Sequence, residues 1–216
     1  MQNFALRQGE RQDRAGAIWF ACNVTGVDMV DSSELDFGPL ADLIGTWKGD
    51  KGTDIAPEPD GAETNPYFET ITVTPVGDVT NAESQTLVAA HYRQVVQRKS
   101  NGKVFHDQTG YWMWDAATNT IMHSLTIPRA VSVLAGGVYD GATDAQDRAI
   151  VEVQARAGDA DWGVIESPFM RDNAHTVAFR IRMVVGKDSL SYAETTIVDI
   201  YGKRFEHTDE NELIRV

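Results

Sequence analysis

Five histidines are the side chains of this sequence best suited to chemistry, because a neutral imidazole can transfer protons or bind a metal ion. They are His91, His106, His123, His175 and His207. No two of them lie three or four residues apart, so the sequence has no local zinc-binding motif. His91 and His123 fall within predicted strands, where alternate side chains share a face. Each could therefore line an internal cavity or form an ordinary structural hydrogen bond.

Arg180 and Arg182 are the other candidates for ligand contact. They alternate with Phe179, Ile181 and Met183 in a predicted strand, so the two sets face opposite sides. If the apolar set faces the core, the arginines face solvent. In the reverse orientation an inward arginine could pair with a ligand carboxylate.

The sequence lacks the motifs of several common enzyme classes. It has no glycine-rich phosphate loop leading into a helix, no Gly-x-Ser-x-Gly elbow and no His-Glu-x-x-His zinc helix. The absence of these motifs does not decide whether the protein is an enzyme of another class.

The composition is that of an acidic globular protein. The chain has 216 residues, a formal net charge of −13 and a hydrophobic content of 42%. Such a charge repels phosphate backbones and anionic lipids, so we expect neither nucleic-acid nor membrane binding. Cys22 is the only cysteine, which excludes an internal disulfide, and the first residues lack the order of a secretory signal. We therefore expect a cytoplasmic protein.

Short apolar runs separated by turn-forming residues organise the chain. In the central part these runs are Val104–Trp114, Thr120–Thr126 and Ala130–Ala135, all rich in β-branched or aromatic residues. This pattern is typical of consecutive antiparallel strands, and it continues to Val216, giving about ten strands and hardly any helix. Because an open sheet of that size leaves edges exposed, the sequence predicts an all-β fold, a closed antiparallel up-and-down β-barrel of the calycin type, as in lipocalins and fatty-acid-binding proteins.

The barrel is predicted to form one domain over residues 38–216. Residues 1–37 are predicted to be an N-terminal extension that packs on it. Pro39–Ile44 is predicted as a short helical turn, because its apolar residues share one helical face. Lys51–Asn65 is rich in glycine, proline and acidic residues and is predicted as a loop. Trp47, between two glycines, is predicted to plug one end of the barrel.

Three segments resemble the nitrobindin family of heme-binding β-barrels. Gly45-Thr46-Trp47-Lys48-Gly49 is similar to the start of the family's Gly-x-Trp-x-Gly-x-Gly motif. Phe105–Trp112 is similar to its His-x-Glu-x-Gly-Tyr-Trp strand, and Phe205–Val216 to its closing strand. The resemblance covers about residues 40–216.

The resemblance implies a cofactor and a metal ligand. In that family the histidine of the last strand is the axial ligand of heme iron, so His207 is the expected metal ligand and heme b the expected cofactor. Family members bind nitric oxide and are credited with isomerising peroxynitrite to nitrate. Gly45, Trp47 and Gly49 match the family motif. They join the candidate cofactor-binding residues, which are Thr208, His91, His123, Arg180 and Arg182.

The sequence departs from the family pattern in two places. Lys51 replaces the last glycine of the first motif, and His207 stands one residue farther from the terminal valine than the family spacing. In a strand, a shift of one residue turns a side chain to the opposite face. Either a bulge between Glu206 and Asp209 returns His207 to the interior, or Thr208 faces inward and His207 faces water.

Three functions follow from these observations. The first is a ligand-binding barrel that holds heme b or another small hydrophobic acid. The second is a ferric-heme enzyme that acts on peroxynitrite or binds nitric oxide. The third is a barrel filled by its own side chains, whose extension mediates assembly, for example into a homodimer.

Overall fold

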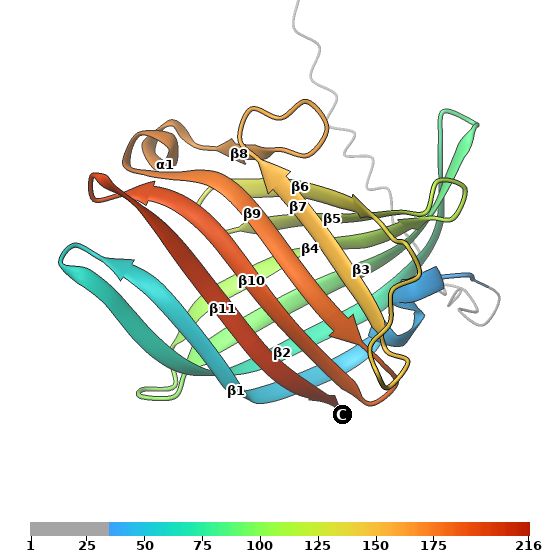
Figure 1. Cartoon of the computed structure of the whole chain (residues 1–216), viewed down its shortest axis with the longest axis horizontal. Coiled ribbons are helices and arrows are strands. Elements are labelled where there is room, and N and C mark those ends of the chain that lie inside the picture. The colour runs from blue at the N-terminus through green and yellow to red at the C-terminus, as the bar shows by residue number, and fades with distance from the viewer. Residues whose placement is uncertain (1–34) are drawn as a thin grey trace, which may run out of the picture.

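The molecule is a barrel whose strands follow one another around the wall (Figure 1). The structure is a computed structural model that describes residues 35–216. Its strands are β1 Gly45–Glu58, β2 Gly61–Asn81, β3 Gln85–Arg98, β4 Val104–Asp115, β5 Thr120–Ile127, β6 Val131–Val138, β7 Ala149–Arg156, β8 Val164–Glu166, β9 Ala174–Val185, β10 Ser189–Ile200 and β11 Lys203–Arg215. Two short helices accompany them, η2 Gly38–Leu43 before β1 and α1 Pro168–Asn173 before β9.

Ten of these strands close into a ring. Pairing runs in the order β5-β4-β3-β2-β1-β11-β10-β9-β7-β6, and β5 also pairs with β6, which completes the circle. All of these pairs are antiparallel, and the short strand β8 attaches to β6. The prediction of a closed, up-and-down barrel of about ten strands is confirmed.

Helix η2 plugs one end of the barrel. Its Leu40 and Leu43 are buried, and Phe37, just before the helix, is buried with them. Trp47 on β1 is also fully buried, and its indole Nε1 donates a hydrogen bond of 2.9 Å to the carbonyl oxygen of Leu43. This helix is the turn expected at Pro39–Ile44, and Trp47 is a core residue of the plugged end.

A β-bulge in β1 determines which of its side chains face inward. The pairing of β1 with β2 shifts by one residue between Gly49 and Gly52, and the pairing with β11 shifts in the same region. Asp54 follows Trp47 by an odd number of positions, so a regular strand would turn the two side chains to opposite faces. The extra residue of the bulge restores the phase. Both Trp47 and Asp54 are therefore buried.

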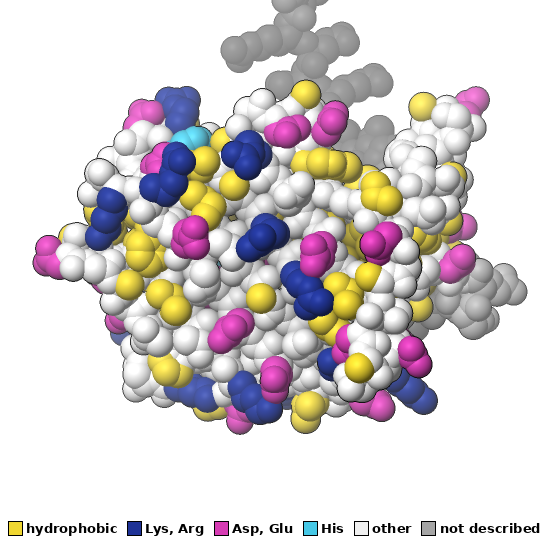
Figure 2. Space-filling view, in the orientation of Figure 1, with side chains coloured by type: hydrophobic (Ala, Val, Ile, Leu, Met, Phe, Trp, Pro, Cys, Tyr) yellow, Lys and Arg dark blue, Asp and Glu magenta, His cyan; other side chains and the backbone are white. Residues whose placement is uncertain are grey.

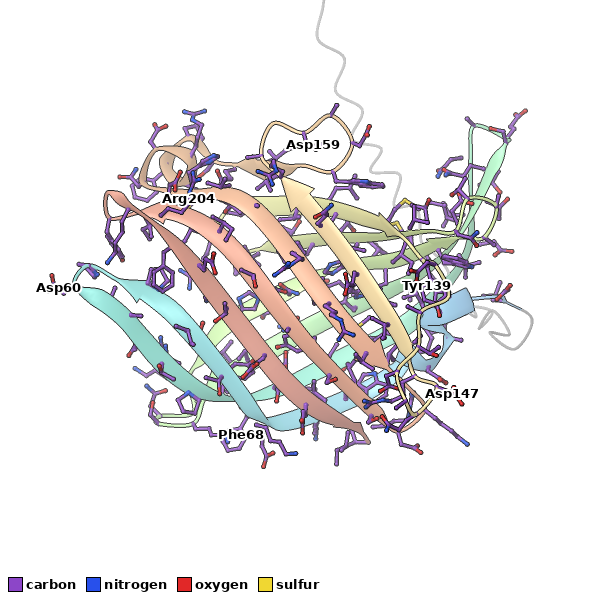
Figure 3. The ribbon with its side chains drawn as sticks, viewed as in Figure 1. Asp60, Phe68, Tyr139, Asp147, Asp159 and Arg204 are labelled. Carbon is purple, nitrogen blue, oxygen red and sulfur yellow. The ribbon has the colours of Figure 1, made fainter. Side chains whose placement is uncertain are left out.

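The prediction of a loop over Lys51–Asn65 is wrong. These residues continue β1 to Glu58 and begin β2 at Gly61, and Asp60 marks the turn of this long hairpin (Figure 3). Hydrogen bonds from the neighbouring strand hold the backbone extended despite a composition typical of loops. Gly52 even has a packing role, because a Cβ there would meet the ring of Tyr67.

Residues 35–216 share one hydrophobic core. The predicted extension, residues 1–37, lies almost entirely outside the described residues, so its packing on the barrel stays a prediction. Within residues 35–216, neither helix has the length and apolar character needed to cross a membrane.

Candidate functional site

The end of the barrel opposite η2 is called the mouth here, and it comprises residues 54–65, 98–106 and 200–209. The turn at Asp60 lies at this end and the loop at Asp147 at the other (Figure 3). The side chains of His207 and Asp209 keep 31% and 26% of their surface exposed. Solvent therefore reaches the inner wall at the mouth.

His207 faces the interior of the barrel at the mouth. Strand β11 pairs with β10 without a register shift along its length, so its side chains alternate regularly. Asn211 and Leu213 are buried on the inner face, and His207 shares their phase. Thr208 has the opposite phase and faces outward. The extra residue lies in β1, and the pairing of Glu206–Asp209 with β10 contains no bulge.

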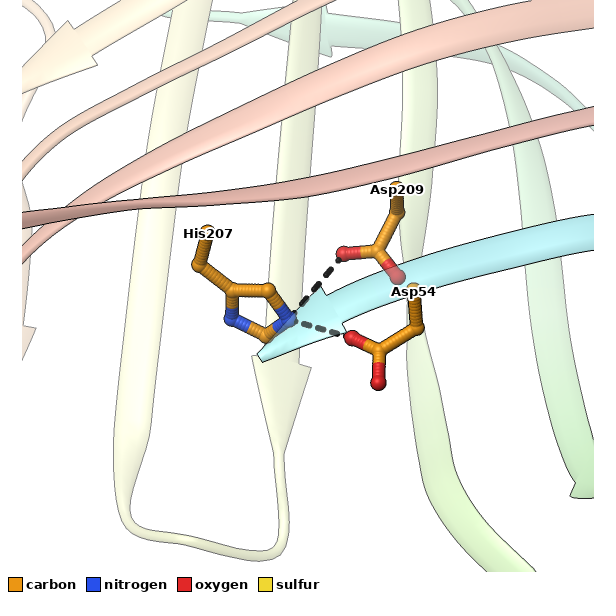
Figure 4. A group of neighbouring side chains, drawn as sticks. All are labelled: Asp54, His207 and Asp209. Atoms are coloured by element: carbon orange, nitrogen blue, oxygen red, sulfur yellow. Dashed lines mark hydrogen bonds and ion pairs between the residues drawn. The ribbon is translucent and has the colours of Figure 1, made fainter. Parts of the chain in front are cut away.

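Asp54 and Asp209 complete a cluster with His207. Asp54 on β1 pairs directly with Asp209 on β11, two residues from His207. The Nε2 atom of His207 lies 2.6 Å from Oδ1 of Asp54 and 3.4 Å from Oδ2 of Asp209 (Figure 4). The second oxygen of Asp54 accepts a hydrogen bond of 2.9 Å from Nδ2 of Asn65. We call Asp54, His207 and Asp209 the His207 cluster.

The cluster shifts the pKa values of its members in opposite directions. Burial favours a lower pKa for His207, but its hydrogen bond to Asp54 and the charges of Asp209 and Asp54 outweigh burial and raise the pKa. Burial favours a higher pKa for Asp54, yet hydrogen bonds from His207 and Asn65 lower it. Burial raises the pKa of Asp209, and the neighbouring charge of Glu194 adds to the effect. Asp54 is therefore the carboxylate that stabilises a positive imidazole.

A polar layer fills the barrel just inside this cluster. It consists of Tyr67, Glu69, Gln94, Tyr192 and Asn211. Glu69 is buried and accepts hydrogen bonds from the Tyr192 hydroxyl at 3.0 Å, from Asn211 Nδ2 at 2.7 Å and from Gln94 Nε2. The Tyr67 and Tyr192 hydroxyls are 2.8 Å apart. Burial raises the pKa of Glu69 to about 7, although these hydrogen bonds oppose the rise.

His123 lies deeper, inside the packed core. Its ring stacks on Trp112 with a centroid distance of 3.9 Å, and Nε2 is 2.8 Å from the Tyr92 hydroxyl. The Nδ1 atom has no hydrogen-bond partner among the described residues. Burial lowers the pKa of His123 to about 3, so the imidazole is neutral. His123 faces the interior, but it packs as a core residue away from the mouth.

His91 lies on the outside of the barrel. Its neighbours on β3, Ala90 and Tyr92, are buried, so His91 has the outward phase. Its Nε2 atom is 2.8 Å from the Thr109 hydroxyl, and its ring meets the edge of Tyr111. It cannot contact a ligand held inside.

Arg180 and Arg182 also lie on the outer face. Acidic and basic side chains are interspersed over the face drawn in Figure 2. Arg182 pairs with Glu152 at 2.9 Å. Arg180 lines an outer cavity of about 380 Å³ beside Trp162. The interpretation that an arginine of this strand meets a ligand carboxylate inside the barrel does not agree with these positions. The apolar set, not the arginines, faces the core.

Gly45, Trp47 and Gly49 belong to the plugged half of the barrel. Gly45 has a φ of +137°, and the guanidinium of Arg215 occupies the space that a Cβ would take. Gly49 leaves room for the side chain of Asn211, which reaches Glu69. These residues shape the wall and the polar layer, and they do not reach the mouth.

The sequence interpretation missed three carboxyl residues. Glu69 shares the phase of Ile71 and Val73 on β2, so alternation could have placed it inside. Asp209 shares the phase of His207 and could have been found in the same way. No such signal was available for Asp54, because its inward orientation depends on the bulge.

Comparisons with known proteins agree with the fold. A family model described as "THAP4-like, heme-binding beta-barrel domain" matches residues 36–215. A solved crystal structure of Rv2717c from M. tuberculosis is similar, with a TM-score of 0.58 and 19% sequence identity over 82% of this chain and 94% of that chain. No match is found among the curated proteins. At that identity the structural likeness supports the barrel fold alone.

Proposed function

Because this chain belongs to the THAP4-like heme-binding β-barrel family, also known as the nitrobindin family, we propose that its barrel binds heme b at the mouth, with His207 as the axial ligand. The observation that carries the proposal is the inward orientation of His207 at an end that solvent reaches. Solvent reaches this end, whereas η2 and Trp47 fill the other end.

The donor chemistry around His207 fits a heme iron. A metal-binding imidazole commonly offers one nitrogen to the metal and donates a hydrogen bond from the other to a carboxylate. Asp54 accepts such a bond from Nε2, and Nδ1 has no hydrogen-bond partner among residues 35–216. His207 would supply the imidazole that holds the iron, and Asp54 would keep the ring oriented and basic. Asp54 therefore acts as a positioning residue.

Other groups at the mouth suit a flat acid. The rings of Tyr67 and Phe105 lie 6.3 Å apart and supply aromatic surface. The Arg98 guanidinium lies 4.6 Å from the Phe105 ring, where it can pair with a ligand carboxylate. We therefore assign to Arg98 the contact with a ligand carboxylate that the sequence suggested for Arg180 or Arg182. The polar layer excludes the ligand from the middle of the barrel.

The experiment is a hemin titration of the full chain, followed by visible absorption. Saturation at one heme per chain with a histidine-ligated Soret band supports the proposal, and a protein that stays spectrally inert contradicts it. A ferric heme would supply an iron that binds nitric oxide and related species. Peroxynitrite decay with and without heme then separates a heme carrier from an isomerase, the second activity that the nitrobindin resemblance suggests. The proposed partner is a small molecule, since a net charge of −13 disfavours nucleic acid.

A further inference from the structure

The His207 cluster presents three metal-ligand atoms on the side of the imidazole that faces Asp54. One nitrogen and two carboxylate oxygens lie within 4.8 Å of one another. They come from two directly paired strands, so the barrel wall fixes their backbone positions. This arrangement combines an imidazole with carboxylates from neighbouring strands, and it forms on the inner wall where solvent still enters.

The ligand that is most buried is already held in place. The Asp54 side chain is only 3% exposed. Its second oxygen accepts a hydrogen bond from Asn65, whose side-chain oxygen in turn accepts one of 3.1 Å from Arg98. Metal-binding carboxylates are oriented by hydrogen bonds of this kind. The chain from Arg98 through Asn65 thus fixes Asp54 with one oxygen directed at His207.

A third carboxyl group lies next to the cluster. Glu194 pairs directly with Asp209 across β10 and β11, and the two side chains share the inner face. The inner wall at this end therefore carries three carboxyl groups, those of Asp54, Asp209 and Glu194. The nearby Arg98 directs its guanidinium at Asn65 and Glu63.

From this geometry we propose that the His207 cluster binds a divalent first-row transition-metal ion. One imidazole nitrogen with two carboxylate oxygens suits zinc, cobalt, manganese or ferrous iron. The ion replaces the proton between Nε2 of His207 and Oδ1 of Asp54, and that proton leaves to solvent together with any proton on the Asp209 carboxyl. Three protein ligands leave coordination positions open to water or to a small anion that enters at the mouth. The site consists of side chains of this chain alone and needs no heme to form, so this inference does not rest on heme binding.

The test is a Co²⁺ titration of the full chain after treatment with a chelator, because visible absorption of Co²⁺ reports its coordination. The variants are Asp54→Asn and Asp209→Asn, with thermal unfolding to confirm that each is folded. Asp209 is partly exposed, so Asp209→Asn is the variant better suited to keep the fold. Asp199→Asn is the matched control, because Asp199 pairs with Arg204 away from the cluster.

The wild type and Asp199→Asn are expected to saturate at one Co²⁺ per chain with the intense absorption of a four- or five-coordinate ion. Each cluster variant is expected to bind at least tenfold more weakly. A weak spectrum of hydrated Co²⁺ that is the same in all four proteins would overturn the proposal. A hemin titration of the same proteins separates the two proposals. Co²⁺ binding without any Soret band would remove the heme proposal and leave the metal site. A Soret band without Co²⁺ binding would remove the metal site and leave the heme proposal.

Discussion

The Nε2 atom of His207 lies 2.6 Å from Oδ1 of Asp54, although the two residues are 153 positions apart in the sequence. Two features of the fold create this contact. Closure of the barrel pairs β1 with β11, and the bulge in β1 turns Asp54 to the inner face. One extra residue in a strand therefore decides whether the histidine at the mouth has a buried carboxylate partner.

Trp47 is predicted to be a major contributor to stability. It is fully buried against η2, and the Arg215 guanidinium lies 4.2 Å from its ring. Trp47→Ala should lower the free energy of unfolding by about 3–5 kcal/mol, as for other buried aromatic truncations. Urea unfolding measures the change. Phe169→Ala, which truncates a side chain that is 70% exposed, is the control and should change stability by no more than about 0.5 kcal/mol. Equal effects of the two substitutions would show that Trp47 does not plug the barrel.

Gly110 is predicted to be intolerant of even a methyl group. A Cβ at this position would collide with the carbonyl group of Ser124 on the adjacent strand β5, and backbone cannot move aside cheaply. Gly110→Ala should destabilise the protein by about 1–3 kcal/mol through overpacking. Gly61→Ala is the matched control, because a Cβ at Gly61 meets nothing within 4 Å. Thermal unfolding of the two variants should differ clearly, and identical midpoints would contradict the close approach of β4 and β5.

The fold was predictable because its signals are local. Alternating β-branched and aromatic runs such as Thr120–Thr126 mark strands, and a ring of about ten strands follows from their number and spacing. Local signals also explain why the segment Lys51–Asn65 was predicted wrongly as a loop. Its composition is that of a loop, but its two halves pair with each other as a hairpin, for example Asp54 with Asn65, and residues 53–55 also pair with β11.

The candidate site was predictable only in part. The resemblance to nitrobindins pointed to His207, but strand phase depends on bulges that the sequence does not reveal. The sequence left open whether a bulge in β11 or an outward His207 explains the changed spacing; β11 has no bulge in its pairing with β10, and the extra residue lies in β1. Because this bulge changes which residues of β1 face inward, the sequence did not reveal Asp54 as the closest partner of His207.

Glu69 is predicted to make stability depend on pH. Its pKa is about 7 in the folded protein, above the 4.5 of a free glutamate. The unfolded chain thus loses this proton at lower pH than the folded chain, so the contribution of Glu69 to stability falls as pH rises from about 4.5 through 7. Glu69→Gln removes the ionisable group, so its stability does not include this loss at high pH. The variant should gain about 3 kcal/mol relative to wild type between pH 4.5 and pH 8.

Urea unfolding at both pH values tests the prediction for Glu69. Glu152→Gln, an exposed glutamate on the outer face, controls for the removal of one negative charge. A difference between Glu69→Gln and wild type that is the same at pH 4.5 and pH 8 would mean that Glu69 is not a buried acid.

The most direct test of the proposed heme site compares His207→Ala with Thr208→Ala in a hemin titration. The two residues are adjacent on β11, but His207 faces the interior and Thr208 faces outward. We expect the wild type and Thr208→Ala to develop the same histidine-ligated Soret band and His207→Ala to develop none. A Soret band that survives in His207→Ala, or one that is lost in Thr208→Ala while the protein remains folded, would contradict the proposed heme site.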